Sequence, residues 1–226
     1  MMRTGACIFD LDGVIVDTAR YHFLAWKKLA DQLGVHFTEE DNERLKGVSR
    51  MASLEIILEL GKIKTDEISK ERYAILKNNW YVDFINKMTP GELLPGSIEF
   101  IMELKKASIQ VAIGSASKNT PLILSRVGIL QLFDAVADGN NVSKAKPNPD
   151  VFLKAAEMVN VRPQKCVVFE DAIAGVQAAL NAGMMCIGIG SPTILTEAHF
   201  VVSGLKEMNL EKLLTIEKMQ GYEKLL

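Results

Sequence analysis

The chain has 226 residues, of which 48% are hydrophobic and 24% charged, and its formal net charge is −2. This length predicts one large domain, or one domain with an insertion, and the composition is that of an ordinary soluble globular protein. The small net charge argues against a basic field that would attract nucleic acid or a membrane surface.

The first part of the chain predicts one short strand followed only by helices. The apolar run from Ala6 to Phe9 indicates a buried strand, and Asp17-Thr18 is typical of a helix N-cap. Apolar residues then recur at helical spacing, which places helices at about 18–33, 39–45, 51–60 and 66–85. We therefore expect a wholly helical block from about residue 16 to 88.

From Pro95-Gly96 onward, strands and helices are expected to alternate. The expected strands cover 111–114, 135–137, 166–169, 185–189 and 200–202, and the expected helices cover 97–107, 120–127, 149–159, 172–182 and a segment from about 209. Such alternation predicts parallel βαβ units.

These two patterns together predict an α/β fold with a doubly wound, Rossmann-like parallel sheet. The helical block interrupts the alternation after the first strand, so we interpret it as an inserted α-helical cap domain. The predicted core comprises residues 1–15 and 91–226, and the predicted cap comprises residues 16–90. Linkers near 14–17 and 88–95 are expected to form the hinge.

The three cysteines, Cys7, Cys166 and Cys186, lie far apart within apolar runs. We expect buried, unpaired thiols and a reducing compartment. No apolar segment reaches the roughly 18 residues of a membrane span, and the N-terminal segment lacks the apolar core of a secretion signal. The sequence therefore predicts a cytoplasmic protein with no membrane partner and no nucleic-acid partner.

Two aspartates, Asp10 and Asp12, directly follow the first predicted strand, and Gly13 frees the backbone to turn sharply. Two carboxylates this close repel each other unless a cation or another strong partner joins them. Alone, the Asp-x-Asp-Gly pattern is a weak signal, because calcium loops and ordinary turns share it.

Polar side chains also follow later apolar runs, at Ser115, at Lys146 and at the pair Glu170-Asp171. Parallel strands bring such positions to one rim of the sheet. Four carboxylates suit Mg²⁺, which prefers oxygen ligands, and Lys146 would offset their charge and help to hold a phosphoryl group. Structural alternatives remain: Ser115 or the acidic pair can cap a helix, and Lys146 can be solvated.

In this order, the four motifs resemble those of the haloacid dehalogenase superfamily, in which Asp-x-Asp-Gly, Ser/Thr, Lys and paired acids each follow a strand. The resemblance spans nearly the whole chain. Within that superfamily it is strongest to the hexose phosphate mutases, over segments 9–15, 21–26, 45–50, 115–119 and 146–150. Gly114 departs from this pattern, because alanine is common there, and the departure predicts a looser loop.

The resemblance implies that Asp10 is the nucleophile and forms an aspartyl phosphate, while Asp12 is the general acid and base. Ser115, the Ala116 backbone N–H and Lys146 would hold the transferring phosphoryl oxygens. The implied metal is Mg²⁺. Its ligands would be the Asp10 carboxylate, the Asp12 backbone carbonyl and Asp171, with Glu170 close by.

The resemblance also implies that the cap recognises substrate. Arg50 would bind the second, non-reacting phosphate, with Lys118 and Asn119 contacting it from the core. His22 and Lys77 would steer Asp12 into position, and Thr18 would lie at the hinge. Further implied substrate-binding residues are Trp26, Gly47, Val48, Ser49 and Ser117.

These cap assignments have structural alternatives as well. His22 lies one helical turn from Trp26 and can be an ordinary packed histidine. Lys77 and Arg50 can belong to solvated helix faces, and Lys118-Asn119 can be plain loop residues, because charged side chains usually stay at the surface.

The implied reaction interconverts β-D-glucose 1-phosphate and glucose 6-phosphate through β-glucose 1,6-bisphosphate, with a hexose phosphate as the partner of a monomeric enzyme. A sugar-phosphate phosphatase is the first alternative, because it shares the chemistry and uses water as the final acceptor. A phosphonate-hydrolysing relative and a binding protein that has lost catalysis are further alternatives. Intact Asp10, Asp12, Lys146 and Asp171 argue against the last of these.

Overall fold

The computed structural model describes residues 4–45 and 48–223, and within them the core is a six-stranded parallel sheet. The strands are β1 (Ala6–Phe9), β2 (Gln110–Gly114), β3 (Ala135–Ala137), β4 (Cys166–Glu170), β5 (Met185–Ile189) and β6 (Phe200–Val202). Their order across the sheet is β3-β2-β1-β4-β5-β6, and every pairing is parallel. The predicted doubly wound α/β fold is therefore confirmed.

The predicted helices are present, with ends that differ by one or two residues. They are α1 (Ala19–Gln32), α2 (Glu39–Glu43), α3 (Arg50–Leu60), α4 (Glu67–Ile85), α5 (Ser97–Lys106), α6 (Thr120–Arg126), α7 (Asp150–Met158), α8 (Ile173–Asn181) and α9 (Leu210–Glu223). None of the helices in the described ranges is long and apolar enough to cross a membrane.

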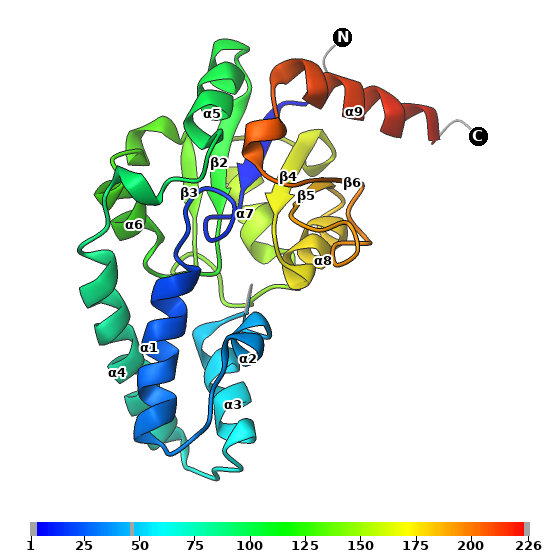
Figure 1. Cartoon of the computed structure of the whole chain (residues 1–226). Coiled ribbons are helices and arrows are strands. Elements are labelled where there is room, and N and C mark those ends of the chain that lie inside the picture. The colour runs from blue at the N-terminus through cyan, green and yellow to red at the C-terminus, as the bar shows by residue number, and fades with distance from the viewer. Residues whose placement is uncertain (1–3, 46–47, 224–226) are drawn as a thin grey trace.

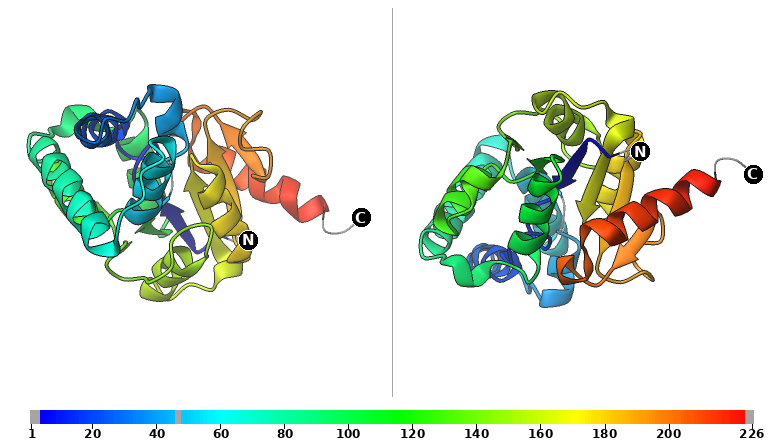
Figure 2. Two further views of the ribbon diagram at one scale, coloured as in Figure 1. Left: turned by 90° about the horizontal axis from the view of Figure 1, so that it is seen from below. Right: turned by 90° about the horizontal axis from the view of Figure 1, so that it is seen from above.

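Helices cover both faces of the sheet (Figure 2), and the side chains of β1 alternate between two apolar layers. Phe9 belongs to the layer that includes apolar residues of α5, α6 and α9. Ile8 belongs to the opposite layer, formed with α7 and α8. The strand is buried on both sides, which explains its continuous apolar run.

Helices α1 to α4 form the predicted cap, which lies below the sheet in Figure 1. Residues of α1, α3 and α4 pack around their own apolar cluster, which includes Trp26, Leu29, Leu54 and Ile57. Near the core, Tyr81 and other residues of α1 and α4 join the sheet's larger apolar layer instead. The cap thus has its own core and is packed onto the sheet domain at one end.

The two linkers between cap and core lie side by side. Val16 forms an antiparallel bridge with Leu93. The backbone N–H of Leu94 donates to Ile15 over 2.9 Å, and that of Asp17 donates to Glu92 over 2.9 Å. The two crossings are therefore tied to each other by backbone hydrogen bonds.

Gly114 has a packing role that the sequence did not predict. It is buried at the end of β2, and a Cβ there would lie 2.6 Å from Cδ1 of Phe152. The Phe152 ring fills the space that a side chain at position 114 would occupy. The backbone N–H of the next residue, Ser115, donates to the carbonyl of Ala137 over 3.1 Å. The cysteines are buried and unpaired, as predicted.

Chain order reverses at the centre of the sheet, because β2 and β3 follow on one side of β1, and β4 to β6 lie on the other. Open α/β sheets bind ligands at the carboxyl ends of the strands beside such a switch point. In Figure 1 the arrowheads of β1 and β4 point toward the cap. The fold therefore directs the residues after β1 and β4 into the space between core and cap.

Candidate active site

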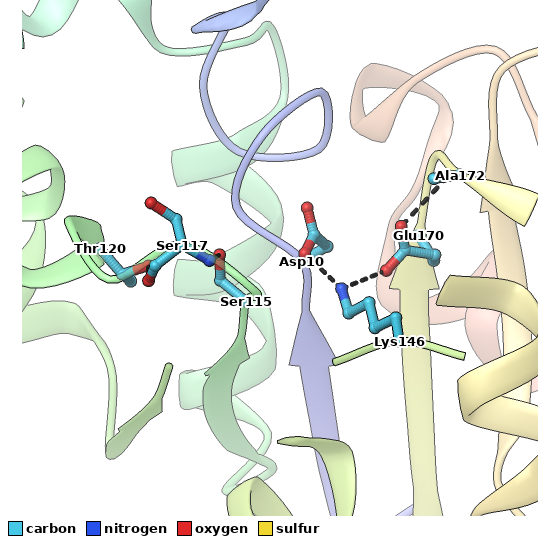
Figure 3. A network of polar contacts seen from close by, with 7 residues as sticks. All are labelled: Asp10, Ser115, Ser117, Thr120, Lys146, Glu170 and Ala172. Atoms are coloured by element: carbon cyan, nitrogen blue, oxygen red, sulfur yellow. Dashed lines mark hydrogen bonds and ion pairs between the residues drawn. The ribbon is translucent and has the colours of Figure 1, made fainter. Parts of the chain in front are cut away.

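The centre of the site is an ion triad that spans the switch point. Nζ of Lys146 donates to Oδ1 of Asp10 over 2.5 Å and to Oε2 of Glu170 over 2.7 Å (Figure 3). The Lys146 and Glu170 side chains are 1% and 0% exposed, so the alternative of a solvated lysine is wrong. Burial lowers the pKa of Lys146, but the two carboxylates outweigh burial and hold that pKa above its usual value.

The buried lysine and Glu170 make further contacts nearby. Nζ of Lys146 lies 4.6 Å from the centre of the Phe152 ring. The peptide bond between Lys146 and Pro147 is cis. Glu170 is fixed in turn, because its Oε1 accepts the backbone N–H of Ala172 over 3.1 Å. Glu170 is part of β4 and makes no side-chain capping bond to α8, whose N-cap is Ala172.

The carboxylates of Asp10, Glu170 and Asp171 form a cluster in which one oxygen of each lies within 4.8 Å of the others. This donor set contains only hard oxygen atoms, and Lys146 balances one of its negative charges. Mg²⁺ prefers such ligands and keeps other positions for water and phosphate oxygen. The cluster therefore fits the predicted metal.

Two glycines leave room for these carboxylates. A Cβ on Gly175, in α8, would collide with the carboxyl group of Glu170. A Cβ on Gly13 would collide with that of Asp171, and Gly13 also has a φ of +81°, which favours glycine. Both acids therefore occupy space that a larger residue would take.

Asp12 lies beside the cluster, and its carboxylate accepts a hydrogen bond from the Thr18 hydroxyl. Thr18 occupies the N-cap of α1 as predicted, but its hydroxyl makes no capping bond. Burial, and then the charge of Asp10, raise the pKa of Asp12 to about 6. This carboxyl group can therefore gain or lose a proton near neutral pH, as a general acid and base must.

The loop after β2 presents a row of backbone N–H groups and hydroxyls. The N–H of Ser117 donates to Oγ of Ser115 over 3.1 Å, and the N–H of Asn119 donates to Oγ of Ser117 over 3.2 Å. Ser115 thus folds its own loop and does not cap α6, which begins at Thr120. Figure 3 shows Ser115 and Ser117 on the side of Asp10 opposite Glu170.

The cap contributes a buried cationic group to the site. Lys77 is 2% exposed, which excludes the solvated face considered for it. Its Nζ lies 3.1 Å from Nδ1 of His22 and 4.5 Å from the centre of the Trp26 ring. Burial, and then the nearby Arg50, lower the pKa of Lys77 well below its usual value. Burial also lowers the pKa of His22, with Lys77 adding to the effect.

Arg50 is the first residue of α3, and burial lowers its pKa. The hydroxyl of Ser49 accepts the N–H of Ala52 over 3.2 Å, so it caps this helix. Val48 also lies at this edge of the cap, whereas Gly47 falls outside the described residues.

A cleft of about 1560 Å³ joins these parts, with lining from both core and cap. Thr18 and Glu170 lie outside its lining, behind Asp12 and Lys146 respectively. The predicted site residues that line it are Asp10, Asp12, His22, Trp26, Val48, Ser49, Arg50, Lys77, Ser115, Ala116, Ser117, Lys118, Asn119, Lys146 and Asp171.

Sequence reasoning missed Tyr81 and Asn78, which line this cleft, and Gly175, which packs against the Glu170 carboxyl group. The Tyr81 ring packs against His22 at a tilt of 37°, with 4.1 Å between ring centres, and its buried hydroxyl has no hydrogen-bond partner in the described structure. Its position, four residues after Lys77 in α4, was an available signal, because such residues share a helix face. Asn78 and Gly175 carried no comparable signal in the sequence.

The fold and this site identify the class of protein. A family model for haloacid dehalogenase-like hydrolases matches residues 4–183. The chain belongs to this family.

Individual relatives narrow the comparison. The β-phosphoglucomutase of Bacillus subtilis is 44% identical over 210 residues, which cover 92% of this chain and 93% of that protein. The crystal structure of β-phosphoglucomutase from Clostridium difficile has a TM-score of 0.93 at 41% identity, over 96% of this chain and 98% of that one. A phosphorylated carbohydrates phosphatase of Thermotoga maritima is 33% identical over 180 residues, which cover 79% of this chain and 82% of that protein.

The first prediction concerns the space beside Glu170. Gly175→Ala should displace the Glu170 carboxylate, lower the free energy of unfolding by about 1–3 kcal/mol and weaken Mg²⁺ binding by about 10–100-fold. Urea unfolding and calorimetric Mg²⁺ titration measure these effects. Gly204→Ala is the matched control, because a Cβ there meets nothing within 4 Å. Equal Mg²⁺ affinity in wild type and Gly175→Ala would contradict the assignment.

The second prediction concerns the buried Lys77. Its pKa is lower in the folded protein, so between that lowered pKa and about 10.4, the usual value, the unfolded chain binds more protons at this position. Wild-type stability should therefore rise relative to Lys77→Met as the pH rises from 7 to 10. Urea unfolding of both proteins across this range gives the difference. A difference that stays constant with pH would show that Lys77 titrates normally.

Proposed function

We propose that the protein interconverts β-D-glucose 1-phosphate and glucose 6-phosphate through β-glucose 1,6-bisphosphate. The observation that carries this proposal is a cleft that is lined by Asp10 and Lys146 and also by two further basic side chains, Arg50 and Lys118. A mutase must accept a phosphate at each end of its sugar. The resemblance to β-phosphoglucomutases over nearly the whole chain supports the same assignment.

The proposed nucleophile is Asp10. Its Oδ1 is held by Lys146, and Figure 3 shows its other oxygen directed away from that lysine. The enzyme would start phosphorylated on Asp10 and give this phosphoryl group to the 6-hydroxyl of β-glucose 1-phosphate, which breaks the aspartyl O–P bond and forms the bisphosphate. After the bisphosphate turns around, the same Asp10 oxygen would attack the 1-phosphate, form a new O–P bond and release glucose 6-phosphate. Ser115, the Ala116 backbone N–H and the ammonium of Lys146 would hold the transferring phosphoryl oxygens.

Asp12 would act as the general acid and base. Its raised pKa allows the neutral acid to protonate the departing sugar oxygen, and the resulting carboxylate can deprotonate the incoming hydroxyl. We propose that His22 and Lys77 position this group from the cap, because Lys77 contributes to the electrostatic field at Asp12. Mg²⁺, held by Asp10, Asp171 and the Asp12 carbonyl with Glu170 close by, would neutralise charge on the phosphoryl group.

The second phosphate is assigned to the opposite end of the cleft. Arg50 can donate two parallel hydrogen bonds to it, and Lys118 and Asn119 would approach it from the core. Trp26, Val48 and Ser49 also line the cleft, and we assign them to the sugar.

We also propose that residues 16–90 move as the cap and that residues 1–15 with 91–226 form the core. Support comes from the separate apolar cluster of the cap and from the paired linkers. Closure would exclude water from the aspartyl phosphate, which favours transfer to sugar over hydrolysis.

The test is phosphorus NMR of β-glucose 1-phosphate with the protein, Mg²⁺ and a trace of the bisphosphate. Glucose 6-phosphate should accumulate, and Asp10→Asn should abolish its formation because the nucleophile is lost. Release of inorganic phosphate alone would identify a phosphatase, like the relative from Thermotoga maritima. Turnover retained by Asp10→Asn would remove Asp10 from its role.

A separate prediction addresses the cap. Arg50→Ala should lower kcat/KM for hexose phosphate conversion by at least about 10-fold, since a charge-assisted contact to phosphate is lost. Hydrolysis of p-nitrophenyl phosphate, which carries only the reacting phosphate, should change less than about twofold. Steady-state kinetics with both substrates make the comparison. Equal losses would show that Arg50 does not serve the second phosphate.

A further inference from the structure

The side chain of Asn119 does not serve the helix that follows it. Asn119 occupies the N-cap position of α6, yet its side chain makes no capping hydrogen bond there. Asparagine is among the residues that most often cap a helix through their side-chain oxygen. Here Nδ2 of Asn119 instead donates to Oδ1 of Asn78 over 3.0 Å. The side chain thus takes its partner from another part of the molecule.

This hydrogen bond joins core and cap inside the cleft. Asn78 belongs to α4 of the cap, Asn119 belongs to the core loop after β2, and both residues line the cleft. Asn78 directly follows Lys77, and Asn119 directly follows Lys118. The bond therefore connects the helix that carries the buried cap lysine to the loop assigned to the second phosphate.

The core holds the rest of this loop by itself. Nδ2 of Asn140 donates to the carbonyl of Lys118 over 3.0 Å and to Oδ2 of Asp138 over 3.1 Å. Asp138 is 2% exposed, so Asn140 is held by a carboxylate that is buried in the core. The loop backbone is anchored on the core side, whereas the Asn119 carboxamide is oriented from the cap.

Carboxamide chemistry gives this orientation a consequence. The nitrogen carries two N–H donors, and the oxygen can only accept. By accepting one N–H of Asn119, Asn78 fixes which end of that carboxamide faces α4. One N–H stays available for an anion, whereas a carboxamide free to rotate would present its oxygen as readily as its nitrogen.

We propose that Asn78 is a positioning residue for the non-reacting phosphate of the hexose bisphosphate. It orients Asn119 so that a donor, and not the carbonyl oxygen, meets that phosphate. The inference rests on the proposed function, because it requires a second phosphate in the cleft. It adds to the phosphate site a residue that acts through Asn119 and not by direct contact.

The experiment measures binding in an Asp10→Asn background, in which the bisphosphate is not consumed. Calorimetry with β-glucose 1,6-bisphosphate should show about tenfold weaker binding when Asn78→Ala is added. Affinity for inorganic phosphate, which can occupy the reacting site alone, should stay within about twofold. The effect of Asn78→Ala should also disappear once Asn119→Ala is present, because the two residues act as a unit.

Two control variants separate positioning from simple attachment of the cap. Asn86→Ala removes a second hydrogen bond between cap and core, from Arg126 over 2.8 Å, at residues outside the cleft lining. Asn79→Ala changes the exposed neighbour of Asn78 on the same helix. Both variants should bind the bisphosphate like the Asp10→Asn parent.

The outcomes distinguish this inference from the proposed function. Equal weakening by Asn86→Ala, or additive effects of Asn78→Ala and Asn119→Ala, would overturn the role of Asn78 alone. An Asp10→Asn parent that fails to bind the bisphosphate would overturn the proposed function, and the inference with it.

Discussion

The ion triad of Asp10, Lys146 and Glu170 is the interaction on which the rest of the site depends. Carboxylates that end neighbouring strands of a parallel sheet meet in a poorly solvated place, where each charge is costly without a partner. A single ammonium satisfies two of them and fixes one oxygen of Asp10. The remaining negative charge, shared with Asp171, is what makes the cluster suitable for a divalent cation.

Much of the fold could be predicted, because each local pattern had one consistent explanation. The apolar run Ala6–Phe9 is buried on both faces, and a strand of this kind is typical of a parallel sheet. Strands and helices alternate after residue 95, so the long helical block that follows the first strand had to be an insertion into that alternating fold. The rim residues were predictable for the same reason, since strand ends in a parallel sheet converge.

Details that depend on close packing could not be predicted. The space for the Glu170 carboxylate exists only because Gly175 approaches it from α8, and no spacing rule relates these two positions. The close approach of the Phe152 ring to Gly114 was likewise not predicted, because it depends on how α7 packs on β2. The partnership of Asn78 with Asn119 depends on how α4 lies over the core, which sequence periodicity does not determine.

The two hydrogen-bonded linkers restrict how the cap can move relative to the core. Because Val16 pairs with Leu93, the two crossings form one short ribbon, and bending this ribbon breaks fewer contacts than sliding its strands. For the cap movement proposed above, such an attachment favours rotation about one axis over translation. In that movement Arg50 would return to the same distance from Ser115, so the bisphosphate of the proposed reaction would meet the same spacing between its anion sites in both orientations.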